Sequence, residues 1–213
     1  METYCPEERW NTLSHGLGFL LSLLGFALLL SKGIDLDNWI YLSSLEVFGI
    51  TLIFLYFSST VYHFVKTPKK KALFKTIDHI AIYFLIAGTY TPFTVITLGD
   101  TWGIGMLITI WTLALLGGVF KLFYTGRFNV FSTLLYLAMG WLSILIIKPM
   151  IVNLAWDGVL LLTWGGVIYT VGTVFYLADR MPYNHAVWHL FVIGGSVLHF
   201  LSVFYYVEPG LMS

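Results

Sequence analysis

Residues 16–31 read GLGFLLSLLGFALLLS, and the stretch between Arg9 and Lys32 contains no Asp, Glu, Lys or Arg. A run of about 20 apolar residues is long enough to cross the ~30 Å hydrocarbon core of a bilayer as a helix. Residues Met1–Asn11 are acidic and lack the basic region of a signal peptide. We therefore expect the first apolar run to be retained as a membrane span rather than cleaved.

The remaining chain repeats this pattern. Of the 213 residues, 58% are hydrophobic and only 10% are charged, whereas a soluble domain carries about 25% charged residues. Short segments containing Gly, Pro or charged residues separate further apolar runs. The sequence predicts an all-α membrane protein whose residues 1–213 form a single seven-helix transmembrane domain. The predicted spans are about 13–31, 39–64, 76–98, 102–122, 130–148, 158–177 and 185–207.

The basic residues predict the orientation of these spans. Only Lys32 and Lys148 flank one set of span ends. The opposite set, which includes the N-terminus, carries Arg9, Lys66, Lys69, Lys70, Lys71, Lys75, Lys121, Arg127 and Arg180. Because cytoplasmic loops are enriched in Lys and Arg, we expect a cytoplasmic N-terminus and an extracellular C-terminus. The segment Lys66–Lys75 is expected to be a basic loop that fixes this topology.

Composition also excludes several classes of partner and site. The formal net charge is zero, so the chain lacks the basic field typical of nucleic-acid binding. Cys5 is the single cysteine, which excludes an intrachain disulfide and a zinc site built from cysteines. Any zinc ion must use nitrogen and oxygen ligands, and the sequence gives no basis for a soluble protein partner.

Ionisable residues of different spans fall at one depth. His63, Asp78 and His185 each lie within five residues of a basic residue that marks the cytoplasmic end. At 1.5 Å of helical rise per residue, they lie roughly 5 Å inside that boundary, and His189 lies one turn deeper. Ionisable groups inside a membrane are costly and usually functional. The shared depth therefore points to one polar site.

The spacing of these residues favours a metal site. His185 and His189 are four residues apart, so they share a helix face and can bind one Zn²⁺ ion, with His63 as the third ligand. Three protein ligands plus a water are typical of catalytic zinc. Asp78 is predicted as a catalytic residue that holds the zinc-bound water. Ser59, one turn before His63, would hydrogen-bond to that water, to a ligand or to the backbone. The alternative is a set of ordinary interhelical hydrogen bonds near the membrane interface.

The residues before the first span form a further candidate group. Glu8, Asn11 and His15 share one face if the first helix begins this early. They would then orient the zinc ligands or close the cytoplasmic mouth of the site. Alternatively, the glutamates only stabilise a helix start through the helix dipole.

Other polar and small residues are predicted to serve packing. His79 directly follows Asp78 and points about 100° away around the helix, so we place it outside the metal site. His199 is expected to form core hydrogen bonds. Three glycine pairs are predicted to allow close helix approach. These pairs are Gly117-Gly118, Gly165-Gly166 and Gly194-Gly195.

Taken in order, the motifs resemble those of the hemolysin III group of the progestin and adipoQ receptor (PAQR) family, whose eukaryotic members include the adiponectin receptors. The motifs are Glu8-x-x-Asn11-x-x-Ser14-His15, Ser59-Thr60-Val61-Tyr62-His63, Ile77-Asp78, Gly88-Thr89-Tyr90-Thr91-Pro92-Phe93 and His185-Ala186-Val187-Trp188-His189. The resemblance implies that His63, His185 and His189 are zinc ligands. It also implies that Asp78 contacts the metal-bound water and that Ser59 is the serine of the second motif.

Three functions are compatible with these residues. The relation of the family to ceramidases implies a metal-dependent intramembrane hydrolase that cleaves a lipid amide or ester with zinc-activated water, so that a membrane lipid is the substrate or ligand. A non-catalytic sensor or regulator with structural zinc is the first alternative. A membrane-lytic protein is the second, although the outer halves of the spans are too apolar for a polar lane through the bilayer. We expect a multi-pass protein of a bacterial plasma membrane.

Overall fold

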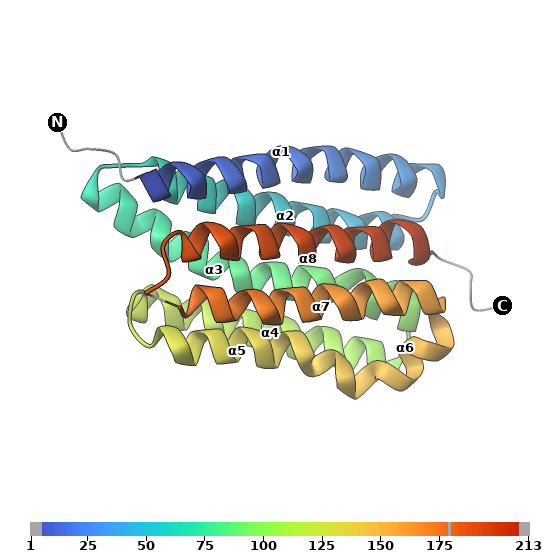
Figure 1. Ribbon diagram of the computed structural model, residues 1–213. Helices are drawn as coiled ribbons and strands as arrows, with labels where there is room; N and C mark the ends of the chain where they lie inside the picture. Colours follow the sequence, from blue (N-terminus) through green and yellow to red (C-terminus); the bar gives the residue numbers. More distant parts are fainter. Residues whose placement is uncertain (1–5, 179, 209–213) are drawn as a thin grey trace.

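A computed structural model describes residues 6–178 and 180–208, and all regular elements in these ranges are helices. Seven helices are long and apolar enough to cross a membrane. The first helix begins at one end of the bundle, and the last helix ends at the opposite end (Figure 1). The predicted fold class, an all-α multi-pass membrane protein with seven spans, is confirmed. Cys5 lies outside the described residues.

Three of the seven spans differ in detail from one continuous α-helix of the predicted length. The third span continues from α3 into a π-helical turn, η1, and the fifth passes from α5 through a 3-10 turn, η2, into α6. The first begins well before residue 13. The elements are α1 (Pro6–Asp35), α2 (Trp39–Phe64), α3 (Pro68–Pro92), η1 (Phe93–Leu98), α4 (Thr101–Tyr124), α5 (Asn129–Trp141), η2 (Leu142–Ile146), α6 (Ile147–Asn153), α7 (Trp156–Tyr176) and α8 (Asn184–Tyr206).

The prediction of a basic loop at Lys66–Lys75 is wrong for most of its length. Helix α3 begins at Pro68, directly after the N-cap residue Thr67. Proline is well tolerated in the first helical turn because its missing N–H would have no intrahelical partner there. Hydropathy marks where the chain leaves the hydrocarbon, whereas the backbone hydrogen bonds of the helix continue beyond it. The lysines from Lys69 to Lys75 therefore lie on the first turns of α3.

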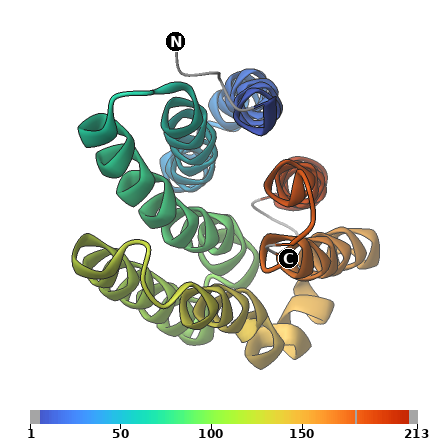
Figure 2. The same ribbon diagram turned by 60° about the vertical axis from the view of Figure 1, so that its left-hand side comes forward.

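The spans pack as a ring (Figure 2). Helix α1 contacts α2 and α8, and the ring continues through α3, α5 and α7. Helix α4 packs against α3. Large apolar side chains such as Leu13, Trp39, Phe123 and Leu145 are exposed on the outside of the bundle, as expected of a surface that faces lipid. The first and last spans thus lie side by side, which brings distant sequence motifs together.

One glycine of each predicted pair lies at a close helix contact. A Cβ added to Gly117, Gly165 or Gly195 would clash with an aromatic or histidine ring of a neighbouring helix. These rings belong to Tyr83, His199 and Tyr169. The other glycine of each pair would meet ordinary contacts or none. His199 also hydrogen-bonds through Nε2 to the Leu162 carbonyl oxygen at 3.1 Å, which matches its expected role in the core.

Candidate metal centre

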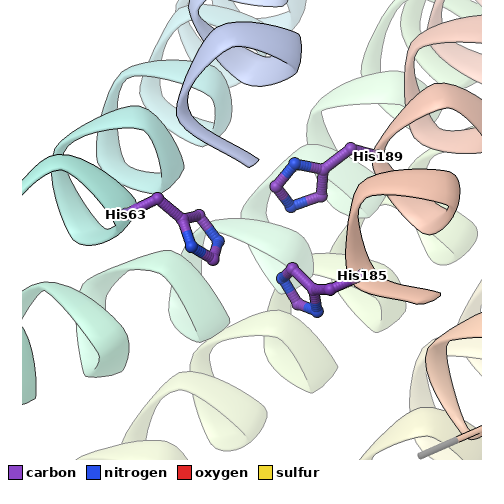
Figure 3. A group of neighbouring side chains, drawn as sticks. All are labelled: His63, His185 and His189. Atoms are coloured by element: carbon purple, nitrogen blue, oxygen red, sulfur yellow. The ribbon is translucent and has the colours of Figure 1, made fainter. Parts of the chain in front are cut away.

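Three histidines from two helices point toward one another (Figure 3). His63 lies in the last turn of α2, and His185 and His189 lie in the first turns of α8. One ring nitrogen of each lies within 4.8 Å of the others. The ring centroids are 4.7–5.1 Å apart. The structure therefore brings together all three residues that the sequence predicted as ligands.

The arrangement fits a divalent transition-metal ion. With Zn–N bonds of about 2.0–2.1 Å, the nitrogens of a tetrahedral site lie roughly 3.4 Å apart. The three nitrogens lie within 4.8 Å of one another, so they would have to approach by at most about 1.4 Å to reach this spacing. Neutral imidazole nitrogens suit zinc and its neighbours, whereas magnesium and calcium prefer oxygen. Among the described residues, this group contains no carboxylate, so Asp78 is not part of it.

Glu8 orients the ring of His63. Its Oε2 atom accepts a hydrogen bond from His63 Nδ1 at 2.7 Å, and its Oε1 atom accepts one from Lys71 Nζ at 2.9 Å. A carboxylate at Nδ1 fixes the imidazole tautomer and makes the other nitrogen a better metal ligand. An ion would therefore be bound through Nε2 of His63. Sequence reasoning missed Lys71, because it placed that lysine in a loop.

Helix α1 orients His189 in the same way. His189 Nδ1 lies 3.2 Å from the backbone oxygen of Asn11 and 3.0 Å from the Ser14 hydroxyl. A carbonyl oxygen only accepts, so Nδ1 carries the proton and Nε2 is the nitrogen that would bind an ion. Ser14 belongs to the first quoted motif, but its role was not predicted. The signal was its position three residues after Asn11, on the same helix face.

His15 and Ser59 form a buried layer beside the histidines. The His15 ring stacks on that of His189, with centroids 3.4 Å apart and planes at 11°. His15 Nδ1 lies 2.7 Å from Ser59 Oγ. Asp78 of α3 is buried and interacts with the side chains of Ser59 and His63. The predicted residues Glu8, Asn11 and His15 thus all lie against the site, on the helix that begins at Pro6.

His79 does not belong to the group of three histidines. Its Nδ1 donates a hydrogen bond to the Lys75 carbonyl oxygen at 2.7 Å. That nitrogen lies 3.8 Å from Asp78 Oδ2. The hydroxyl of Tyr136, on α5, donates a hydrogen bond to the His79 carbonyl oxygen at 3.1 Å. His79 also interacts electrostatically with Lys121, His63 and His185, so it adjoins the histidine group without being one of the three candidate ligands.

Comparison with known proteins gives one consistent picture. Residues 3–200 match the protein family described as Haemolysin-III related. The chain is 44% identical to Hemolysin-3 of Bacillus cereus over 98% of this chain and 95% of the relative. It is 44% identical to a Hemolysin-3 homolog of Bacillus subtilis over 94% of each chain. It is also 30% identical to the human protein called Monocyte to macrophage differentiation factor, over 95% of this chain and 85% of that protein.

Proposed function

Because this chain belongs to the haemolysin-III related family and brings three histidines together in a membrane bundle, we propose that it is a zinc-dependent intramembrane hydrolase of a lipid amide or ester. The observation that carries this proposal is the convergence of His63, His185 and His189, whose ring nitrogens lie within 4.8 Å of one another. A donor set of three imidazoles with no carboxylate is typical of a catalytic zinc site that keeps one position open.

The three histidines would hold the ion, and helix α1 would hold two of the histidines. Glu8 fixes His63, and Asn11 and Ser14 fix His189. Bound zinc would act as a Lewis acid toward the substrate carbonyl and lower the pKa of a coordinated water toward 7.

Asp78 would act as the proton acceptor. Its carboxylate takes one proton from the attacking water as the water oxygen bonds to the carbonyl carbon of the lipid. The same carboxyl group returns this proton to the nitrogen or oxygen of the leaving group as the bond to that atom breaks. The products are a fatty acid, which retains the second proton of the water until it ionises in solvent, and an amine or alcohol. Ser59, which interacts with Asp78 and hydrogen-bonds to His15, would keep the carboxylate aligned.

The depth of the site favours a lipid substrate. His63 ends the second span, and His185 begins the last, so the site lies near the end of the bundle. The distribution of basic residues supports a cytoplasmic N-terminus, which would assign this end to the inner leaflet. An amide or ester just inside the lipid headgroups would meet the histidines at this level.

Two measurements test the proposal separately. Purified wild type is expected to contain about one zinc ion per chain, and His63→Ala is expected to lose it, because the remaining two imidazoles bind zinc much more weakly. Wild type is expected to hydrolyse a lipid amide or ester. Asp78→Ala is expected to lose this activity and keep its zinc, whereas Asp157→Ala, at an exposed carboxylate in the first turn of α7, keeps both. Unchanged turnover in Asp78→Ala would refute the assigned proton transfer.

The same two measurements distinguish the proposed enzyme from a non-enzymatic protein. Zinc that is present and stabilising, without turnover of any lipid amide or ester tested, would favour a sensor or regulator with structural zinc.

The name Hemolysin-3, carried by the relative from Bacillus cereus, favours membrane lysis as a second candidate function. Lysis would release a dye trapped in lipid vesicles to which the purified protein is added. Release by wild type and by Asp78→Ala alike would favour lysis over hydrolysis. Absence of release at protein-to-lipid ratios that support turnover would argue against it.

A further inference from the structure

A lysine is buried on the far side of α3 from Asp78. Lys121, in the last turn of α4, has 0% of its surface exposed. Its Nζ atom forms no hydrogen bond with any residue in the described part of the chain. An ammonium group taken out of water without a partner costs several kcal/mol, so buried lysines are almost always paired. The position therefore calls for an anion.

Helix packing places a second lysine at this corner. Gly117 lets α4 approach the Tyr83 ring of α3 closely, and Lys121 follows one turn later. Lys121 consequently interacts electrostatically with Lys75 and His79, which lie nearer the start of α3. The Lys75 ammonium reaches the turn between α4 and α5, where a Cβ added to Gly126 would lie 3.7 Å from its Nζ. Two positive charges thus share one end of these three helices.

Two buried hydroxyls extend this group of donors. The buried hydroxyl of Tyr83 on α3 interacts with the hydroxyls of Ser132 and Tyr136 on α5, and neither of these partners is a carboxylate. The Tyr83 ring packs on Tyr136 at a centroid distance of 4.5 Å. We call Lys75, Tyr83, Lys121 and Ser132 the lysine cluster. It offers two ammonium groups and two hydroxyls from three helices.

No carboxylate of the described residues pairs with Lys121. Asp78 is the nearest acid along α3, and it interacts with Lys75 and with the side chains of Ser59 and His63 on α2. His79 uses its Nδ1 on a backbone carbonyl oxygen. The excess of donors over acceptors therefore favours a ligand with several anionic oxygens.

We propose that the lysine cluster binds the phosphate group of an anionic membrane phospholipid. A phosphate presents more acceptor oxygens than a carboxylate, and lysine binds it as a point charge. Basic sites between transmembrane helices near a membrane surface are known to take such headgroups. The cluster lies at the bundle end where α3 begins and α4 ends, the end that carries most of the basic residues. Lys75 also interacts electrostatically with Asp78 and His185, so the cluster lies close to the histidines, but the proposal does not depend on the proposed hydrolysis.

Thermal unfolding in lipid nanodiscs tests this proposal. Phosphatidylglycerol added to phosphatidylcholine nanodiscs is expected to raise the melting temperature of the wild type. Lys121→Met, which replaces the ammonium by an apolar side chain of similar length, is expected to abolish this rise. Lys70→Met removes the same charge from an exposed position on α3 and is expected to retain most of it. Lys121→Arg, which keeps the positive charge, is expected to show part of the rise in melting temperature.

Several results would overturn the proposal. One is a Lys121→Met variant that melts higher than the wild type in both lipid compositions and still responds to phosphatidylglycerol. Replacing a buried charge that binds no ligand by an apolar side chain is expected to stabilise the protein in this way. Another is protection of detergent-solubilised wild type by inorganic phosphate alone, with no further effect of the lipid, because the ligand would then be free phosphate. If Lys121→Met fails to fold, Ser132→Ala provides the milder test, and an unchanged lipid response in that variant counts against the site.

Zinc content distinguishes this site from the metal centre. Lys121→Met is expected to retain the zinc content of the wild type, because Lys121 contacts none of the three histidines. A loss of zinc together with the lipid response would show that the variant disturbs the whole bundle end, and the assignment of a separate phosphate site would fail.

Discussion

Two groups of buried polar residues lie on either side of α3, and they differ in how their polar atoms are satisfied. On the α2 side, histidine Nδ1 atoms have hydrogen-bond partners. His63 bonds to Glu8, His189 to Ser14 and His15 to Ser59. On the α4 side, the Lys121 ammonium has no hydrogen-bond partner among the described residues, and the Tyr83 and Ser132 hydroxyls interact with each other. The first group presents ring nitrogens that can donate electron pairs to a cation, and the second presents a buried ammonium group without a paired carboxylate.

The difference indicates opposite ligands. Nitrogens held by outer hydrogen bonds are preorganised for a cation, because those bonds fix both the ring orientation and the tautomer. A buried ammonium group with no carboxylate partner favours an anion. Asp78 interacts with His63 and Lys75, and His79 interacts with Lys121, Lys75 and His63, so α3 brings the two groups close together. A lipid whose phosphate binds on one side of α3 would lie close to the histidines on the other.

The largest effect is expected from breaking the histidine group. Removing zinc from the wild type with a chelator should lower the melting temperature, because an ion that binds only the folded state contributes about 2.7 kcal/mol at a concentration of 100 Kd. For a chain of this length, that corresponds to a shift of roughly 5–10 °C. His189→Ala should melt near the chelated wild type and show no further response to the chelator.

The matching control lies in the lysine cluster. Lys121→Met should respond to the chelator as the wild type does. An equal chelator response in His189→Ala and in the wild type would show that the ion stabilises some other site.

The three candidate ligands could be predicted because two simple regularities identify them. His185 and His189 share a helix face through their spacing, and His63 lies at a similar distance from a basic span end. The structure brings them together as expected. The contacts that hold them were harder to predict, since they require knowing that α1 begins at Pro6 and that α3 begins at Pro68. Both starts lie outside the apolar runs, where hydropathy gives no signal.

The burial of Lys121 could not be predicted from the sequence either. Its place near a span end made it one more basic residue of the cytoplasmic side. Which face of α4 turns toward α3 is decided by the close contact of Gly117 with Tyr83, and an almost uniformly apolar helix carries little pattern to reveal that face. Membrane helices pack through small residues rather than through a hydrophobic stripe. Gly117 was therefore the sequence feature that indicated a close helix contact, and it did not indicate which helix α4 would contact.

An intermediate effect is expected from the carboxylate that holds His63. Glu8→Gln keeps the size of the side chain but loses the charge that bonds to His63 Nδ1 and Lys71 Nζ. Loss of such an outer hydrogen bond typically weakens metal affinity 10–100-fold. Competition with a zinc-binding dye measures this change. Glu7→Gln, at the adjacent carboxylate in the first turn of α1, should bind zinc as the wild type does. If both variants bind equally, the contact with His63 contributes nothing to metal binding.

The smallest effect is expected at Ser14. Ser14→Ala removes the hydroxyl that lies 3.0 Å from His189 Nδ1, but the Asn11 carbonyl oxygen still accepts from the same nitrogen at 3.2 Å. Loss of one of two hydrogen bonds should cost about 1 kcal/mol, which is roughly a fivefold loss of zinc affinity. Ser31→Ala is a close control, because Ser31 Oγ bonds to the carbonyl three residues earlier in α1, as Ser14 Oγ does, but lies exposed far along the helix. A loss of zinc affinity as large as that of Glu8→Gln would mean that the Asn11 carbonyl cannot orient His189 alone. A zinc affinity equal to that of Ser31→Ala would mean that the Asn11 carbonyl suffices.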